Sequence, residues 1–192
     1  MAILKIARMG HSVLVDPAAS IEDPTAERIQ RLIGHMKETM ADAQGIGLAA
    51  PQVYQSLRLI LFLDAADREE ARERAPVVLI NPEIEPLDDR IELGIEGCLS
   101  IPGLQGLVPR HARIGYRGLA PDGRVIEREA EGLHARVVQH EVDHLDGILY
   151  TMRMDDLTQL GFDSEMKHVI ARAQRDTEVA ADDEEAEDEQ SG

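Results

Sequence analysis

Two histidines and a glutamate lie close together in the sequence His140-Glu141-Val142-Asp143-His144. On a helix, side chains four residues apart project from the same face, with Cβ atoms about 5–6 Å apart. Both imidazoles of such a pair can hold one metal ion, while the glutamate after the first histidine can reach a water molecule beside the ion. The same five residues are also compatible with a solvated helix that binds no metal.

The residues before this motif favour a buried face. Leu133 and Val137 precede His140 and His144 at helical spacing, so one helical stripe begins apolar and ends with two imidazoles. Burying two histidines without a ligand would cost free energy, which supports the metal-binding interpretation. Gly147 is a suitable residue to end this helix.

Cys98, the one cysteine of the chain, is the candidate for a third ligand. A catalytic metal site needs three protein ligands and one open position. A lone cysteine excludes an internal disulfide but can be reactive, metal-binding or simply buried, and all three roles suit a reducing compartment. It lies within Glu96-Gly97-Cys98-Leu99-Ser100, and a turn is predicted shortly afterwards at Pro102-Gly103.

Further elements are predicted around these residues. Helical spacing of apolar residues after Asp23, the predicted N-cap, indicates a helix that ends at Gln44. Buried strands are predicted at Arg58–Leu63 and Val77–Ile80. A hairpin is predicted from Arg113–Leu119 and Arg124–Glu129, joined by a turn. A last helix is predicted at about Ser164–Arg175.

The predicted fold class is α+β. We expect a strand-rich single domain whose antiparallel sheets pack around a central helix carrying the HExxH motif, with one N-terminal and one C-terminal helix. At 192 residues and 43% hydrophobic content, one catalytic domain over residues 1–175 is the default.

The net charge of −17 is unevenly distributed. Residues 176–192 hold nine acidic residues and no basic one, so we expect a disordered tail there. The acidic composition is a poor match for free nucleic acid. We find neither a secretory signal nor a membrane-spanning run, and we expect a cytoplasmic protein. Residues 67–74 are predicted to be a charged surface excursion.

Three segments resemble the signature motifs of peptide deformylases, in that family's order and approximate spacing. They are GIGLAAPQ at 45–52, EGCLS at 96–100 and QHEVDH at 139–144. The resemblance covers roughly residues 1–160. It implies a metallohydrolase that removes the formyl group from the N-terminal formylmethionine of nascent polypeptides.

The resemblance also implies roles for individual residues. It makes Cys98, His140 and His144 the metal ligands, Glu141 the acid/base, and the Gln52 amide and the Leu99 backbone N–H the oxyanion donors. A His₂Cys set alone would favour zinc. The resemblance instead implies Fe²⁺ in the cell, with Zn²⁺, Ni²⁺ or Co²⁺ in some preparations.

The implied substrate is a nascent formyl-Met chain, whose methionine enters an apolar pocket near the metal while its backbone pairs with a strand edge. Ile46, Leu133 and Val137 suit the pocket wall, although the last two suit plain core packing nearly as well. The segments that would approach the substrate contain the glycines and the glutamate of the first two motifs, namely Gly45, Gly47, Glu96 and Gly97.

Departures from the family pattern and alternative functions stay open. Tyr54 and Gln105 replace a glycine and an arginine common in the family, and the acidic terminus makes ribosomal RNA docking through it doubtful. We expect a monomer acting near the ribosome exit. The alternatives are a zincin-type endopeptidase, which also uses HExxH, and an inactive metal-stabilised formyl-peptide-binding paralogue.

Overall fold

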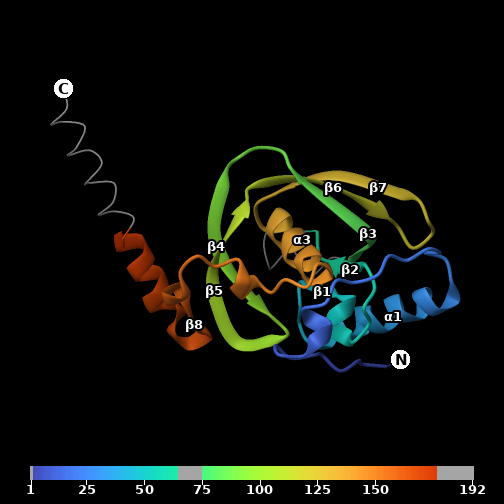
Figure 1. Cartoon of the computed structure of the whole chain (residues 1–192), viewed down its shortest axis with the longest axis horizontal. Helices are drawn as coiled ribbons and strands as arrows, with labels where there is room; N and C mark the ends of the chain where they lie inside the picture. The colour runs from blue at the N-terminus through green and yellow to red at the C-terminus, as the bar shows by residue number, and fades with distance from the viewer. Residues whose placement is uncertain (1, 65–74, 177–192) are drawn as a thin grey trace.

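The computed structural model describes residues 2–64 and 75–176, which form two antiparallel sheets and three helices (Figure 1). One sheet has five strands in the order β1-β2-β3-β6-β7, and the other has three in the order β4-β5-β8. The strands are β1 Gly47–Ala49, β2 Leu59–Phe62, β3 Val77–Pro86, β4 Ile91–Cys98, β5 Ile101–His111, β6 Arg113–Leu119, β7 Val125–Glu131 and β8 Leu160–Phe162. The prediction of antiparallel sheets is confirmed.

The first helix begins later than its sequence pattern predicts. Helix α1 spans Glu27–Asp42 with Ala26 at its N-cap. Asp23 is not the cap, because its carboxylate accepts hydrogen bonds from the N–H and O–H of Thr25 in a local turn. Helix α1 buries one face, which includes Ile29, Ile33, Met36 and Met40.

The other two helices follow their patterns more closely. Helix α3 spans Gly132–Leu145, and Gly147 follows it with a positive φ of 75°, as a helix-ending glycine should. The chain is also helical over 166–176, with Met166 buried. The predicted acidic tail lies outside the described residues except for Asp176, and so does the predicted excursion at 67–74.

The predicted hairpin is present as β6 and β7, joined by the turn at 120–124. Strand β2 also matches its prediction closely. Strand β3 was predicted to end at Ile80 but continues to Pro86. It does so through a register shift between Ile80 and Glu83, where Asn81 has a φ of 50° and Pro82 is accommodated at the irregularity.

Strands β4 and β5 were missed by the sequence analysis, and the turn predicted at Pro102-Gly103 is wrong. The turn lies at Leu99 and Ser100, between the two strands. Pro102 and Gly103 belong to the irregular beginning of β5, where Gly103 has a φ of 78°. Figure 1 shows this long two-stranded ribbon arching away from the five-stranded sheet, with α3 between them.

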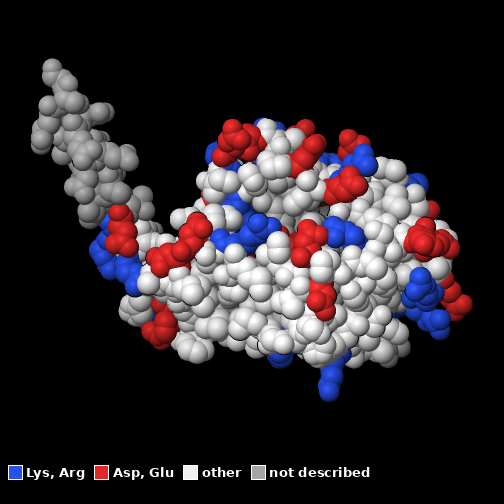
Figure 2. Space-filling model, in the orientation of Figure 1, with Lys and Arg blue, Asp and Glu red and all other residues white. Residues whose placement is uncertain are grey.

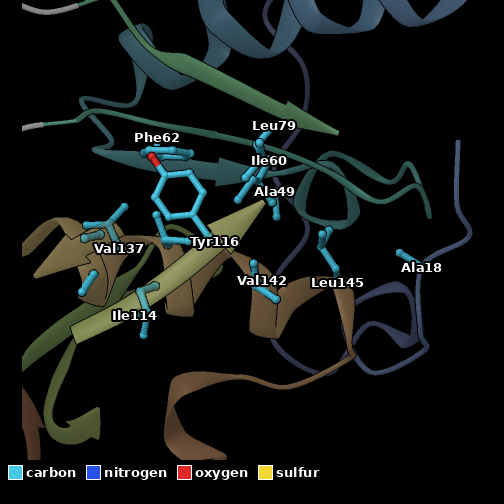
Figure 3. Packing of buried hydrophobic residues seen from close by; sticks show 13 residues of the cluster. Ala18, Ala49, Ile60, Phe62, Leu79, Ile114, Tyr116, Val137, Val142 and Leu145 are labelled. Atoms are coloured by element: carbon cyan, nitrogen blue, oxygen red, sulfur yellow. The ribbon is translucent and has the colours of Figure 1, made fainter. Parts of the chain in front are cut away.

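The main core lies between α3 and the five-stranded sheet (Figure 3). Val137, Val142 and Leu145 of α3 belong to one buried cluster with Phe62 of β2 and Tyr116 of β6. This packing holds the helix by burial of apolar surface at about 25 cal/mol per Å². Because Val137 belongs to the core cluster, its turn of α3 is fixed just before the histidines of the HExxH motif.

Charged side chains of both signs are interspersed on the face shown in Figure 2, with uncharged surface between them. None of the described helices is both long and apolar enough to cross a lipid bilayer.

Candidate metal centre and active site

The last residue of β4 and two residues of α3 bring three metal-binding side chains together. The ligand atoms of Cys98, His140 and His144 all lie within 4.8 Å of one another. The Cys98 Sγ is 3.3 Å from the His144 Nε2. Both histidines are buried, at 9% and 1% exposure, whereas Cys98 is half-buried.

The cluster favours the protonation state that a metal ligand needs at Cys98. Burial acts to raise the pKa of the Cys98 thiol, but the neighbouring His144 and His140 outweigh it and hold that pKa well below its usual value. Burial also acts to lower the pKa of His140. Its contacts with Cys98 and Glu96 outweigh burial and raise that pKa well above its usual value. The sulfur is therefore poised as a thiolate, the form that binds metals.

The residues fit a divalent transition metal. One thiolate and two imidazoles are a donor set for such an ion, with a fourth position left for water or substrate. In addition, the Glu141 Oε2 beside the cluster is buried and has no hydrogen-bond partner among the described residues. Such orphaned polar atoms are costly unless a further group at the site satisfies them.

A buried network of ion pairs, here called the ionic circuit, contacts the Nδ1 of His140. The His140 Nδ1 lies 2.8 Å from a Glu96 carboxylate oxygen, which leaves its Nε2 for a metal. Arg110 binds both oxygens of Glu96, at 2.8 and 3.0 Å, and also binds Asp143. Arg136 adds a third contact to Glu96, at 3.0 Å. Sequence reasoning missed these arginines and Asp143, although the last is part of the HExxH motif.

Glu96 is ionised within this circuit. Burial acts to raise the pKa of its carboxyl group, but hydrogen bonds from Arg110 and His140 lower that pKa to about 2. A buried ionised glutamate fixes the tautomer and orientation of the imidazole it contacts. Glu96 therefore orients His140 in addition to lining the pocket, which is the role that the sequence predicts for it.

Glu141 is buried beside the cluster, with an exposure of 4%. Burial raises the pKa of its carboxyl group to about 7, against the opposing effect of His140 and His144. Its side chain lies directly against Gly47 of β1: a Cβ built on that glycine would be only 2.8 Å from the Glu141 Cγ. The second glycine of GIGLAAPQ is thus required by the close approach of Glu141.

The side-chain amide of Gln52 points into the site. The Ala49 N–H donates to its oxygen at 2.8 Å, so its NH₂ group faces the Cys98 sulfur at 3.4 Å and the Ser100 hydroxyl at 3.3 Å. Leu99 follows Cys98 in the turn, and its carbonyl accepts a 3.1 Å hydrogen bond from Arg8. Both predicted oxyanion donors therefore belong to segments that are held in place.

A cavity of about 420 Å³ opens next to this cluster. Of all the predicted site residues, His144 alone does not line it; the predicted ones that do are Gly45, Ile46, Gly47, Gln52, Glu96, Gly97, Cys98, Leu99, Leu133, Val137, His140 and Glu141. Its wall also includes Arg8, Arg136, Gln105 and Asp163, of which only Gln105 was considered from the sequence.

Comparison with known proteins decides the family. Residues 3–160 match the family described as polypeptide deformylase. The chain belongs to the polypeptide deformylase family. A relative named peptide deformylase 1 from Bordetella pertussis is 52% identical over 161 residues, which cover 82% of this chain and 90% of the relative. Peptide deformylase 1 from Xanthomonas campestris is 46% identical over 86% of this chain and 98% of its own length.

Solved peptide deformylase structures share the fold. A Met-Ala-Ser-bound class I type b peptide deformylase from Acinetobacter baumannii has a TM-score of 0.74 and 36% identity, and the match covers 80% of this chain and 99% of that one. The peptide deformylase from Thermotoga maritima also has a TM-score of 0.74 at 36% identity, over 81% of this chain and 100% of that chain.

Proposed function

We propose that this chain hydrolyses the N-formyl group of formylmethionyl nascent polypeptides and releases formate. One observation carries the proposal: Cys98, His140 and His144 converge within 4.8 Å beside Glu141 and Gln52, at the end of a cavity. Membership of the polypeptide deformylase family supports the same function. We take residues 1–175 as the catalytic domain.

Cys98, His140 and His144 would hold the metal. When bound, a divalent ion would polarise the formyl carbonyl and lower the pKa of water, so that a nucleophile forms near neutral pH. We take Fe²⁺ as the metal in the cell, with Zn²⁺, Ni²⁺ or Co²⁺ as substitutes. A thiolate ligand next to Fe²⁺ makes the protein sensitive to oxidation.

Glu141 is the acid/base in this proposal. Its carboxylate takes a proton from the attacking water and later gives it to the departing amine of methionine. Its buried position beside Gly47 restricts it to one location, and its raised pKa suits a group that both accepts and donates a proton. The positive charge of a metal would act in the opposite direction on that pKa.

Gln52 and Leu99 would stabilise the oxyanion that forms on the formyl oxygen. The Gln52 NH₂ group is aimed at the cluster because Ala49 holds the opposite side of the amide. One such preorganised donor is typically worth about 2.7–4 kcal/mol of transition-state stabilisation.

The cavity would bind the methionine side chain and the first peptide groups. Ile46, Leu133 and Val137 supply apolar wall, and Gly45, Gly47, Glu96 and Gly97 lie on the segments that would approach the peptide backbone. Val137 also packs in the core, so its two interpretations are compatible. The cellular setting we propose is the cytoplasm near the ribosome exit, with the protein acting as a monomer that does not bind nucleic acid.

The decisive experiment measures formate release from formyl-Met-Ala-Ser by anaerobically purified protein, together with the metal content per chain. We expect turnover with about one metal ion bound. Glu141→Gln should keep the metal and lose about 10²- to 10⁴-fold in kcat. Undiminished turnover by that variant would remove Glu141 from the mechanism, and cleavage of unformylated peptides would favour a zincin-type endopeptidase.

A further inference from the structure

The outer face of the β4–β5 ribbon is apolar and exposed. Ile91, Leu93 and Ile95 of β4 are 51%, 59% and 39% exposed. They pair across the ribbon with His111, Pro109 and Leu107 of β5. Successive residues of a strand face opposite sides, so these side chains share one face. We call Ile91, Leu93, Ile95, Leu107 and Pro109 the ribbon outer face.

The charged residues of the same strands are on the other side. Glu96 and Arg110 are buried there, and Arg136 lies against Gly94, where an added Cβ would be 2.6 Å from the guanidinium carbon. The inner side of the ribbon therefore carries buried ion pairs beside the apolar Val108, and the outer side carries exposed apolar groups. A contiguous exposed apolar surface of this kind marks a binding surface.

The ribbon outer face is continuous with the candidate active site. Ile95 belongs to it and also lines the cavity, next to Gly97. Among the described strands, β4 pairs on one side only, with β5, and is the edge of its sheet. A ligand that leaves the cavity along β4 passes Leu93 and then Ile91.

The direction of a bound peptide follows from where its formyl group must lie. Cys98 is the C-terminal residue of β4, so a chain that begins there and extends along the strand runs antiparallel to it. Strand β4 has eight residues and is about 26 Å long, at about 3.3 Å per residue. It can accompany roughly eight residues of an extended peptide.

Side chains would make most of the contact beyond the cavity. Arg136 already donates hydrogen bonds to the carbonyls of Glu92, at 2.7 Å, and Gly94, at 3.4 Å. Apolar residues of a neighbouring extended chain can still pack laterally against Leu93 and Ile91, as cross-strand pairs do on one face of a sheet.

We propose that Leu93 and Ile91 form an extended subsite for about the fourth to eighth residues of the substrate, with a preference for apolar side chains. This inference rests on the proposed function. An unfolded nascent chain is the occupant that fits, because it presents apolar side chains in extended form and its N-terminus is held where the ribbon outer face meets the cavity.

The test compares formyl-Met-Ala-Ser with two longer peptides that share this beginning. Residues 4–8 of one alternate valine and serine, and those of the other are all serine. We expect the valine peptide to have about a three- to tenfold higher kcat/KM than the serine peptide, through a lower KM. Fluorescence anisotropy with the unformylated peptides should give the same order of affinity without turnover.

Variants locate the effect. The double variant Ile91→Thr, Leu93→Thr keeps strand propensity and should lose the preference for valine while cleaving formyl-Met-Ala-Ser at the normal rate. Val125→Thr is the matched control, because Val125 is 69% exposed on β7 of the other sheet. It should leave all three substrates unaffected.

Three results would overturn the inference. The first is equal cleavage of both long peptides by the unaltered protein. The second is a double variant that is equally impaired on formyl-Met-Ala-Ser, which would indicate a structural role. The third is a dimer that the double variant dissociates, measured by light scattering, which would make the ribbon outer face an interface between copies. Failure of the proposed function is distinguishable, since the unaltered protein would then release no formate from any of the peptides.

Discussion

Helix α3 buries histidines in two different environments. Near its N-terminus, the His134 ring has its Nδ1 3.2 Å from an Asp64 oxygen and its Nε2 3.3 Å from the Tyr116 hydroxyl. The same ring is stacked on Phe62, with centroids 5.6 Å apart. Both ring nitrogens have partners within the protein, so this imidazole has no lone pair to offer a metal.

Near the other end of α3, the imidazoles are left incomplete. His140 uses its Nδ1 for Glu96, and His144 has a buried Nδ1 without a partner among the described residues. The remaining ring atoms converge on Cys98. His134 and His140 have the same 9% exposure, so burial does not distinguish a metal ligand from a structural histidine. Convergence of unused ligand atoms does.

The largest effect that separates the two environments is loss of the metal. His144→Asn should abolish stoichiometric metal binding and reduce formate release by at least about 10³-fold, because a metal-dependent step loses a ligand. His134→Asn should retain about one metal ion per chain. Elemental analysis of both purified variants, with circular dichroism to verify folding, makes the comparison. Equal metal loss in both would show that the two ends of α3 are one structural unit.

Displacement of Glu141 should have the next largest effect. Gly47→Ala places a methyl group against the Glu141 side chain and should lower kcat by about 10²-fold with metal content unchanged, since a displacement near 1 Å costs that much. Gly34→Ala on α1 is the control, because nothing lies within 4 Å of a Cβ added there. Similar rates for both variants would argue against this steric account.

Removing the charge behind His140 should have a smaller effect. Glu96→Gln keeps the size of the side chain but removes the carboxylate charge beside His140 and leaves Arg110 with Asp143 as its remaining buried anion. Loss of such a contact to a metal-binding histidine typically weakens metal affinity about 10- to 100-fold. Competition with a chelator measures this affinity. Glu92→Gln, on the same strand but exposed, should not change it. An unchanged affinity in Glu96→Gln would mean that α3 alone orients His140.

Sequence reasoning found the chemistry of this site more readily than its supports. The pair His140 and His144 is encoded by local helical spacing, and the β6–β7 hairpin by its turn residues. Strands β4 and β5 were missed because several of their apolar residues, such as Leu93, face outward, while Glu96 and Arg110 are charged and buried. Alternation alone gives no reason to bury the charged side.

The ionic circuit was missed for a related reason. Its members are distant in sequence: Arg110 is 14 residues from Glu96 and 33 from Asp143. No local pattern pairs a particular arginine with a particular carboxylate, and the pairing is fixed only when the β4–β5 ribbon packs on α3. The neutral, fully bonded state of His134 likewise depends on residues from two other segments.

The smallest predicted effect concerns stability and its dependence on pH. Burial lowers the pKa of His134 below 6.5, although Asp64 acts in the opposite direction. Below pH 6.5 the unfolded chain therefore takes up a proton at this residue more readily than the folded chain, and stability falls as the pH decreases. His134→Phe removes this dependence but also takes one hydrogen-bond partner from Asp64 and one from Tyr116, at a cost of about 1–3 kcal/mol near pH 8.

Urea unfolding of the metal-free protein at pH 8.0, 6.5 and 5.5 tests this. The difference in free energy of unfolding between the original protein and His134→Phe should be largest at pH 8.0 and should shrink as the pH is lowered, because only the original protein pays for protonating a buried imidazole. A difference that grows toward low pH would mean that Asp64 outweighs burial and that His134 is charged in the fold. In that case His134 would donate from both nitrogens and could not bind a metal at all.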